Sequence, residues 1–354
     1  MRPGVKLPLV LIPAGPLLIM AALASYAQDS PDLLFPEERH LTNVRQLTFG
    51  GENAEAYFSG DEKRLIFQST RAGVECDQIF IMNLDGSDVR RVSTGLGRTT
   101  CAYFFPDTNR ILYSSTHLAD EACPPKVSHG QGYAWPLHAG YDIFTARDDG
   151  SDLKRMTDTP GYDAEATISA DGKRIVFTSI RDGDLELYVM DADGSNQKRL
   201  THKLGYDGGA FFSLDGKKIV FRAGRPKTPE ETKRYRALLA ENLIAPSVLE
   251  VYVINADGSN MRQVTDAGAA SFAPFFHPDG KRIIFASNLH APKGRNFDLY
   301  LVNEDGSGLE RVTKNPTFDS FPMFTRDGRK LVFASNRNNS RRGETNVFIA
   351  DWVD

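Results

Sequence analysis

One short pattern occurs six times along the chain, and this repetition limits the possible folds more than any other feature. In each copy an aspartate opens a turn, a basic residue follows within three positions, and three apolar residues come next. The six aspartates are Asp61, Asp107, Asp171, Asp215, Asp279 and Asp327. Their spacings of 46, 64, 44, 64 and 48 residues indicate one repeating unit with an insertion in two copies. Self-similarity at this period is typical of repeat architectures.

Each unit is predicted to form four short strands. In the third copy these strands cover residues 164–169, 174–178, 185–191 and 197–201, and Asp-Gly turns join the first to the second and the third to the fourth. Four strands in about 45 residues are typical of one propeller blade. We therefore predict an all-β protein, a six-bladed β-propeller over residues 41–354. A solenoid is the alternative, but six blades can close into a ring without exposed ends.

The two ends of the chain predict how the ring closes. The sixth copy reaches only its third strand, residues 346–351, before the sequence ends at Asp354. Residues 44–48 (Val-Arg-Gln-Leu-Thr) closely match residues 261–265 (Met-Arg-Gln-Val-Thr), which form the fourth strand of an earlier copy. The N-terminal segment should therefore complete the last blade and pair an edge that would otherwise promote aggregation. We expect residues 28–38, within the segment 28–40 before the propeller, to contribute little to this closure.

Residues 1–27 are predicted to be a signal peptide. Arg2 and Lys6 precede an apolar stretch over residues 7–23, and Ser25 and Ala27 place small residues where a signal peptidase cleaves. A retained membrane anchor is the alternative, but three prolines interrupt the stretch and no basic residues follow it. We expect a periplasmic or secreted protein with no transmembrane segment after cleavage.

Composition and the missing motifs exclude several function classes. The formal charge is -4 and no basic block is present, so nucleic-acid binding is not expected. The sequence contains no Gly-x-Ser-x-Gly elbow, no Gly-x-Gly-x-x-Gly or P-loop pattern, and no His-Glu-x-x-His motif. We expect a monomer.

The repeats resemble a known family. Residues 277–287 contain Pro-Asp-Gly-Lys-Arg followed by an apolar strand, and residues 255–265 combine Asp-Gly-Ser with a strand that ends in Arg-Gln-Val-Thr. These features are similar to the WD40-like (PD40) repeats of the TolB-like six-bladed β-propellers. The resemblance implies a periplasmic binding platform for an envelope protein, without the α/β domain that precedes the propeller in TolB. Similar repeats also occur in accessory propellers of serine peptidases and in polysaccharide lyases, so the fold alone does not determine function.

Both insertions are predicted to lie on one face of the ring. The Asp-Gly hairpins should form the bottom face, whereas the insertions, at about residues 117–139 in blade 2 and 224–249 in blade 4, fall in top-face loops. Thr228, Pro229 and Glu231 predict a capped helix in the second insertion, which would form a partial lid. The first insertion carries Tyr133 and Trp135. Since loops that vary between blades are typical of a binding face, we expect the top to bind and the bottom to be polar and uniform.

Polar residues recur at fixed positions near the axis, and two interpretations remain open. In the first, they pair with one another and join each blade to its neighbour. In the second, those that differ between blades bind a ligand at the top face. The predicted binding residues are Glu52, Glu55, Asp163, Glu165, Asp207, Asp319, Arg71, Arg181, His117, Tyr133 and Trp135. No cofactor is expected, although the carboxylates near the axis could attract calcium.

The three cysteines predict one disulfide in an oxidising compartment. Cys123 lies in the blade 2 insertion, and its partner is either Cys76 or Cys101. The sequence does not choose between them.

The sequence favours an exported scaffold that binds a protein or peptide in the cell envelope without catalysis. The alternative is a metal-dependent enzyme, of polysaccharide lyase or hydrolase type, that uses the funnel of the top face.

Overall fold

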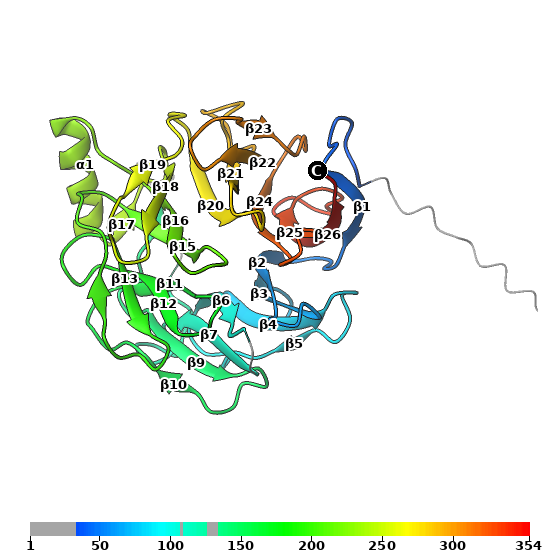
Figure 1. The fold of residues 1–354 in the computed structure, drawn as a ribbon. Helices are drawn as coiled ribbons and strands as arrows, with labels where there is room; N and C mark the ends of the chain where they lie inside the picture. Colours follow the sequence, from blue (N-terminus) through cyan, green and yellow to red (C-terminus); the bar gives the residue numbers. More distant parts are fainter. Residues whose placement is uncertain (1–32, 107–108, 126–133) are drawn as a thin grey trace, which may run out of the picture. The chain divides into compact units, whose positions relative to one another are not determined.

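The computed structural model describes residues 33–106, 109–125 and 134–354. Over these residues the chain forms six four-stranded antiparallel sheets arranged around a common axis (Figure 1). The predicted six-bladed β-propeller is confirmed. No helix in the described ranges is long and apolar enough to cross a membrane.

The two inner strands of every blade follow directly from the Asp-Gly hairpins. The innermost strands are β2 (Glu52–Phe58), β6 (Thr99–Phe104), β11 (Asp163–Ile168), β15 (Asp207–Phe212), β20 (Ser271–Phe276) and β24 (Asp319–Phe324). The second strands are β3 (Arg64–Thr70), β7 (Arg110–Ser115), β12 (Arg174–Ser179), β16 (Lys218–Ala223), β21 (Arg282–Ser287) and β25 (Lys330–Ser335). Each second strand is an apolar run, because neighbouring blades bury both of its faces.

The two outer strands complete each blade. The third strands are β4 (Gln78–Asn83), β9 (Asp142–Arg147), β13 (Glu186–Asp191), β18 (Glu250–Asn255), β22 (Asp298–Asn303) and β26 (Asn346–Trp352). The outermost strands are β5 (Arg90–Arg91), β10 (Lys154–Arg155), β14 (Lys198–Arg199), β19 (Arg262–Gln263), β23 (Glu310–Arg311) and β1 (Leu41–Gln46). In each blade an aromatic ring of the second strand lies beside one of the third strand, as Phe67 and Phe80 do at 5.9 Å.

The N-terminal strand closes the ring, as the sequence predicts. β1 pairs antiparallel with β26, with Leu41 opposite Trp352 and Gln46 opposite Phe348. The Leu47 N–H extends this pairing by donating to the Val347 carbonyl at 2.8 Å. Figure 1 shows the first strand (blue) beside the last (dark red). β2 contacts both β6 and β24, so the innermost strands form an unbroken circle.

The segment before β1 contributes a buried ion pair. The Glu38 carboxylate accepts hydrogen bonds from the Arg337 guanidinium at 3.2 Å and from the Lys314 N–H at 2.9 Å. The side chains of Glu38 and Arg337 are at most 1% exposed, and Arg337 also pairs with Asp319 at 2.9 Å. The expectation that residues 28–38 contribute little to closure is therefore wrong, because Glu38 is one of two buried counter-ions of Arg337.

A β-bulge interrupts every innermost strand at the same level. In each strand the pairing register shifts, and one residue adopts a left-handed backbone with φ between 50° and 59°. These residues are Glu55, Cys101, Glu165, Gly209, Ala273 and Phe321. A bulge places an extra residue on one strand, so the alternation of side chains changes there. In β2 both the left-handed Glu55 and Tyr57, two positions later, line a cavity at the axis.

The two insertions meet through a small sheet that the sequence did not predict. β8 (Trp135–Pro136) pairs with β17 (Leu243–Ile244), which joins the insertion of blade 2 to that of blade 4. The predicted helix is α1 (Pro229–Ala240), with Thr228 as its N-cap and Glu231 completing the capping box. Tyr235 anchors the helix to blade 3, since its hydroxyl donates to Asp184 at 2.5 Å.

A disulfide joins Cys76, before the third strand of blade 1, to Cys123 in the blade 2 insertion. Cys101 remains a free thiol on the innermost strand of blade 2. Of the two pairings that the sequence left open, the structure has Cys76 with Cys123.

The Glu38–Arg337 contact can be tested by two neighbouring substitutions in the chain from residue 28 onward. Glu38→Gln should lower the free energy of unfolding by about 2 kcal/mol, because Arg337 loses a charged hydrogen-bond partner in a buried site. Arg39→Gln is the control, since this side chain is 81% exposed and its contact with Glu310 lies on the surface; it should change stability by at most about 0.5 kcal/mol. Urea denaturation measures both. Equal effects of the two substitutions would contradict the buried-pair account.

Peptide mapping without reduction tests the disulfide. Digestion of the oxidised protein should give one linked pair of peptides that carries Cys76 and Cys123, while the Cys101 peptide should react with a thiol reagent only after unfolding. A linked peptide that contains Cys101 would contradict this connectivity.

Candidate functional site

The left-handed residues of the innermost strands form one layer around the axis. A cavity of about 390 Å³, including space open to solvent and here called the upper cavity, is bounded by all six of them and by Tyr57, Ala166, Thr167, Phe211 and Arg222. Their chemistry differs between blades: two carboxylates, a thiol and an aromatic ring share the layer with the small residues Gly209 and Ala273. This layer therefore combines charge with an apolar wall.

Glu165 is fully bonded within the protein. Its carboxylate pairs with Arg222 and accepts hydrogen bonds at 2.8 Å from the Tyr206 hydroxyl, the Thr178 hydroxyl and the Gly209 N–H. Arg222 can reach this position because Gly209 has no side chain: a Cβ there would lie 2.0 Å from a guanidinium nitrogen. Both carboxylate oxygens of Glu165 already accept hydrogen bonds from protein groups. This residue therefore positions Arg222 rather than an incoming ligand.

Glu55 is the carboxylate in this layer with spare capacity. It accepts a hydrogen bond from the Cys101 thiol, and within the described residues no arginine, lysine or histidine forms an ion pair with it. Burial raises its pKa from 4.5 to about 7, and nearby Glu165 and Asp77 add to this rise, whereas Cys101 and Arg222 oppose it. A carboxyl group that is costly to ionise in the empty cavity would gain most from a cationic ligand.

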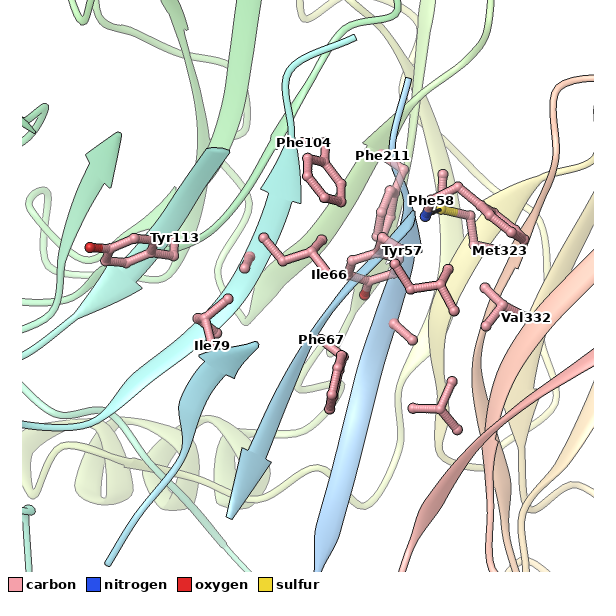
Figure 2. Packing of buried hydrophobic residues seen from close by; sticks show 14 of the residues in the cluster. Tyr57, Phe58, Ile66, Phe67, Ile79, Phe104, Tyr113, Phe211, Met323 and Val332 are labelled. Carbon is pink, nitrogen blue, oxygen red and sulfur yellow. Dashed lines mark hydrogen bonds between the residues drawn. The ribbon is translucent and has the colours of Figure 1, made fainter. Parts of the chain in front are cut away.

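An aromatic layer lies directly below the upper cavity. It consists of the residues two positions after the left-handed ones: Tyr57, Tyr103, Thr167, Phe211, Phe275 and Met323. The ring of Tyr57 lies 5.5 Å from that of Phe211 and 5.3 Å from that of Tyr103. Figure 2 shows Tyr57, Phe211 and Met323 approaching one another from three different strands. Phe211 borders both the upper cavity and the cavity beneath it, so this layer separates the two ends of the axis.

The bottom opening is not uniformly polar, contrary to expectation. A cavity of about 730 Å³, including space open to solvent, lies there among Pro106, Ala170, Leu214 and Pro278. These residues stand immediately before the aspartates of the Asp-Gly turns. The turns are polar at the rim of the face, whereas the residue before each turn lines the axis.

The predicted polar rings form arrays that stabilise the blades. Asp163, Asp207 and Asp319 are almost fully buried, and each pairs with the arginine that follows its own second strand: Arg181 at 2.8 Å, Arg225, and Arg337 at 2.9 Å. Three acids that begin third strands, Asp142, Glu186 and Asp298, pair separately with arginines of the outermost strands, as Asp298 does with Arg311 at 2.5 Å. In blade 4, Glu250 instead accepts hydrogen bonds from the Thr265 hydroxyl and from the N–H groups of Ala267 and Gly268. The rings therefore pair with one another, as the first interpretation expected, but these ion pairs lie within single blades and do not join one blade to the next. A role of these three aspartates in binding stays a prediction.

Carboxylates of neighbouring blades also approach one another. Burial and the adjacent Asp319 raise the pKa of Asp298 to about 7, although Arg311 opposes the shift. The pKa of Asp207 is likewise raised, by burial and by nearby Glu186 on the preceding blade, against the effect of Arg225. Arginines on both sides of each junction offset this repulsion.

The remaining predicted residues lie in different environments. Glu52 is exposed at the start of β2. His117 occupies in blade 2 the position of the ring arginines, and its Nδ1 lies 2.9 Å from the Ser115 hydroxyl. Arg71 bonds to Asn53 at 2.8 Å. Tyr133 lies outside the described residues.

Trp135 packs inside the small sheet of the top face rather than standing free. It is half-buried, its ring meets those of Tyr206 and Phe272 edge-on at 6.4 and 6.2 Å, and the Arg222 guanidinium lies 5.3 Å from its centre. Truncating it would disturb this packing as well as any partner contact.

Sequence reasoning missed Cys101, Arg222 and Tyr206 as members of the site. The polar positions that recur eight residues before the turn aspartates include Asn53, Thr99, Asp163 and Asp207. Counting two residues onward from these gives Glu55, Cys101, Glu165 and Gly209, so the spacing of the repeats contained a signal for the layer. Arg222 has no such signal except the paired glycines Gly208 and Gly209, which leave room for it.

No group of three or more His, Cys, Asp or Glu side chains in the described ranges is arranged to hold a metal ion. Calcium near the axis stays a prediction, which metal analysis of the purified protein would test.

Comparison with known proteins agrees with this architecture. The family model described as "TolB beta propeller domain" matches residues 136–230 and 250–352, which is more than half of the chain. The chain belongs to the TolB β-propeller family.

Solved structures of similar proteins show the same fold at low sequence identity. A putative TolB from Agrobacterium tumefaciens is 18% identical, with a TM-score of 0.53 over 88% of this chain and 97% of that one. TolB from Acinetobacter baumannii is 21% identical with a TM-score of 0.52; the match covers 72% of this chain but only 53% of that protein. An oligogalacturonate lyase from Vibrio parahaemolyticus is 14% identical, with a TM-score of 0.50 over 87% of this chain and 93% of that one.

The raised pKa of Glu55 predicts a specific pH dependence of stability. Between about pH 4.5 and 7 the folded state retains a proton on Glu55 that the unfolded chain releases, so ionisation of this residue destabilises the wild type as pH rises. Glu55→Gln removes this effect, and its stability relative to wild type should increase between pH 5 and pH 8 by up to about 3 kcal/mol. Other carboxyl groups with raised pKa values are present in both the variant and the wild type, so their effects cancel in the stability difference. A difference that does not change with pH would show that Glu55 titrates normally.

Proposed function

We propose that this TolB-family propeller is a non-catalytic binding platform in the cell envelope. Its partner is a protein or peptide that docks on the top face and inserts a basic side chain, or an amino terminus, into the upper cavity. The observation that carries the proposal is the carboxylate of Glu55, which faces this cavity and forms no ion pair within the described residues.

The charge and the walls of the upper cavity suit a cation. Glu55 and Glu165 supply two carboxylates against the one guanidinium of Arg222. The rings of Tyr57, Phe211 and Phe321 form part of the wall, and aromatic faces attract an ammonium or guanidinium group when water is excluded.

The top face offers apolar contact around this opening. Phe49 is 75% exposed in the loop between β1 and β2, and Leu96, Leu118 and Leu204 are exposed in other top-face loops. Exposed aromatic and aliphatic side chains near a charged pocket are typical of protein-binding surfaces. The predicted signal peptide at residues 1–27 supports an envelope location.

A second candidate is the metal-dependent enzyme, favoured by the similarity to the oligogalacturonate lyase fold. The described residues offer no ligand set of three for a metal. Stoichiometric transition metal in the purified protein would favour the enzyme over the platform.

Affinity capture from envelope extract tests the platform with matched bait variants. The wild type should enrich one partner at a fixed stoichiometry, and Glu55→Gln should reduce its capture about tenfold or more, because a desolvated ion pair is lost. Leu214→Ala on the bottom face is the control and should capture as the wild type does. Equal capture by Glu55→Gln and wild type would contradict the role of the upper cavity.

A further inference from the structure

Four blades carry an arginine at the same place, just after the second strand. In blades 1, 3 and 6 its Nε donates to a serine hydroxyl of that strand, as Arg71 does to Ser69 at 3.0 Å and Arg337 to Ser335 at 3.1 Å. The guanidinium lies near the aromatic rings of its blade: that of Arg71 is 5.4 Å from Phe67. The arginines of blades 1, 3 and 6 are therefore presented to the top face in one geometry.

Blade 6 shows how such an arginine takes a carboxylate from outside its blade. Glu38 belongs to the segment before β1 and reaches Arg337 with both carboxylate oxygens. The Lys314 N–H, in the loop that leads into the blade, supplies a third hydrogen bond at 2.9 Å. Phe35 lies 5.3 Å from the same guanidinium and donates its own N–H to Glu38 at 2.9 Å. The segment from Phe35 to Glu38 thus forms a compact turn, in which the aromatic ring and the acid three positions later both contact the arginine.

Blade 1 presents equivalent donors. Thr48 occupies the position before blade 1 that Thr313 occupies before blade 6. The Thr48 hydroxyl accepts a hydrogen bond from the Val347 N–H at 2.8 Å, and the Thr313 hydroxyl accepts one from the Leu299 N–H in the same way. Phe49 therefore corresponds to Lys314. In the described residues the Phe49 N–H donates no hydrogen bond, and its side chain is exposed.

The charge at blade 1 differs from that at the other three arginines. Arg181, Arg225 and Arg337 each pair with an aspartate of the innermost strand, whereas Arg71 meets the amide oxygen of Asn53. Asn53 cannot readily be replaced by aspartate, because its Nδ2 donates to the carbonyls of Gly50 and Thr345 at 2.9 Å. Burial lowers the pKa of Arg71, with no carboxylate offsetting it. This half-buried cation lacks a counter-ion in the described chain.

We propose that Arg71 and the Phe49 N–H form a subsite for a carboxylate on an acidic segment of the partner, bound as Glu38 binds in blade 6. The preferred ligand has an aromatic residue three positions before a glutamate, as in Phe35-Pro36-Glu37-Glu38. This inference rests on the proposed function for the existence of a peptide partner, and it adds a second point of recognition whose charge is opposite to that of the upper cavity.

The chain supplies its own probe. A fluorescein-labelled octapeptide with the sequence of residues 33–40 should bind to the protein from residue 28 onward in a saturable way, measured by fluorescence anisotropy. Arg71→Gln, or Glu38→Gln in the peptide, should each weaken binding about tenfold, and the two together should cost little more than either alone. Arg71→Lys should recover part of the loss, because charge returns without the bidentate geometry. Arg341→Gln, an exposed arginine on the same face, is the control and should bind normally.

Three results would overturn the inference: no binding by the wild type at millimolar peptide, unchanged binding by Arg71→Gln, or equal losses in Arg71→Gln and Arg341→Gln. Failure here would leave the proposed function intact if capture of the envelope partner still depends on Glu55. Loss of both would remove the top face as the binding surface.

Discussion

The pairing of β1 with β26 is the contact on which the rest of the molecule depends. It joins residues about 300 positions apart and turns six sheets into a ring. Without it, blade 6 would have an unpaired edge, and the contact between β2 and β24 would have to hold the ring alone. The buried Glu38–Arg337 pair reinforces the same seam from the top face. Closure also sets the heights of the innermost strands along the axis relative to one another. The layers of side chains around the axis depend on this alignment.

Repetition explains why one position can serve both stability and recognition. The ring arginines neutralise buried aspartates in blades 3, 4 and 6, and these pairs fix the innermost strand against the second strand. At blade 1, next to the seam, Asn53 instead donates to backbone carbonyls, and Arg71 has no counter-ion in the part of the chain that the structure describes. A departure from the repeat that leaves a charge unpaired is costly unless something else binds there. The same reasoning applies to Glu55, whose counterpart in blade 3 is saturated by Arg222.

The fold could be predicted largely from the sequence, and the site only in part. The Asp-Gly turns and apolar runs define the blades, and residues 44–48 reveal the closure because they copy another fourth strand. The capped helix from Pro229 was also predictable, since Thr228 and Glu231 give a local signal. By contrast, β8 and β17 are two residues long and pair across more than 100 positions, so no periodicity marks them. The left-handed conformation of Glu55, Cys101 and Glu165 was hidden as well, because it comes from bulges and not from glycine. Glu38 showed no pattern, since its burial depends on Arg337 near the other end of the chain.

Hydrogen exchange measured by mass spectrometry tests the closure most directly. If β1 is an integral strand of blade 6, the amides of Arg45 and Leu47 should exchange only through global unfolding, with the same opening free energy as those of β25. Their protection should fall in parallel with that of β25 as urea is added. Exchange of the β1 amides many times faster than that of β25, and independent of urea, would show that the strand opens locally and would contradict a ring closed by this pairing.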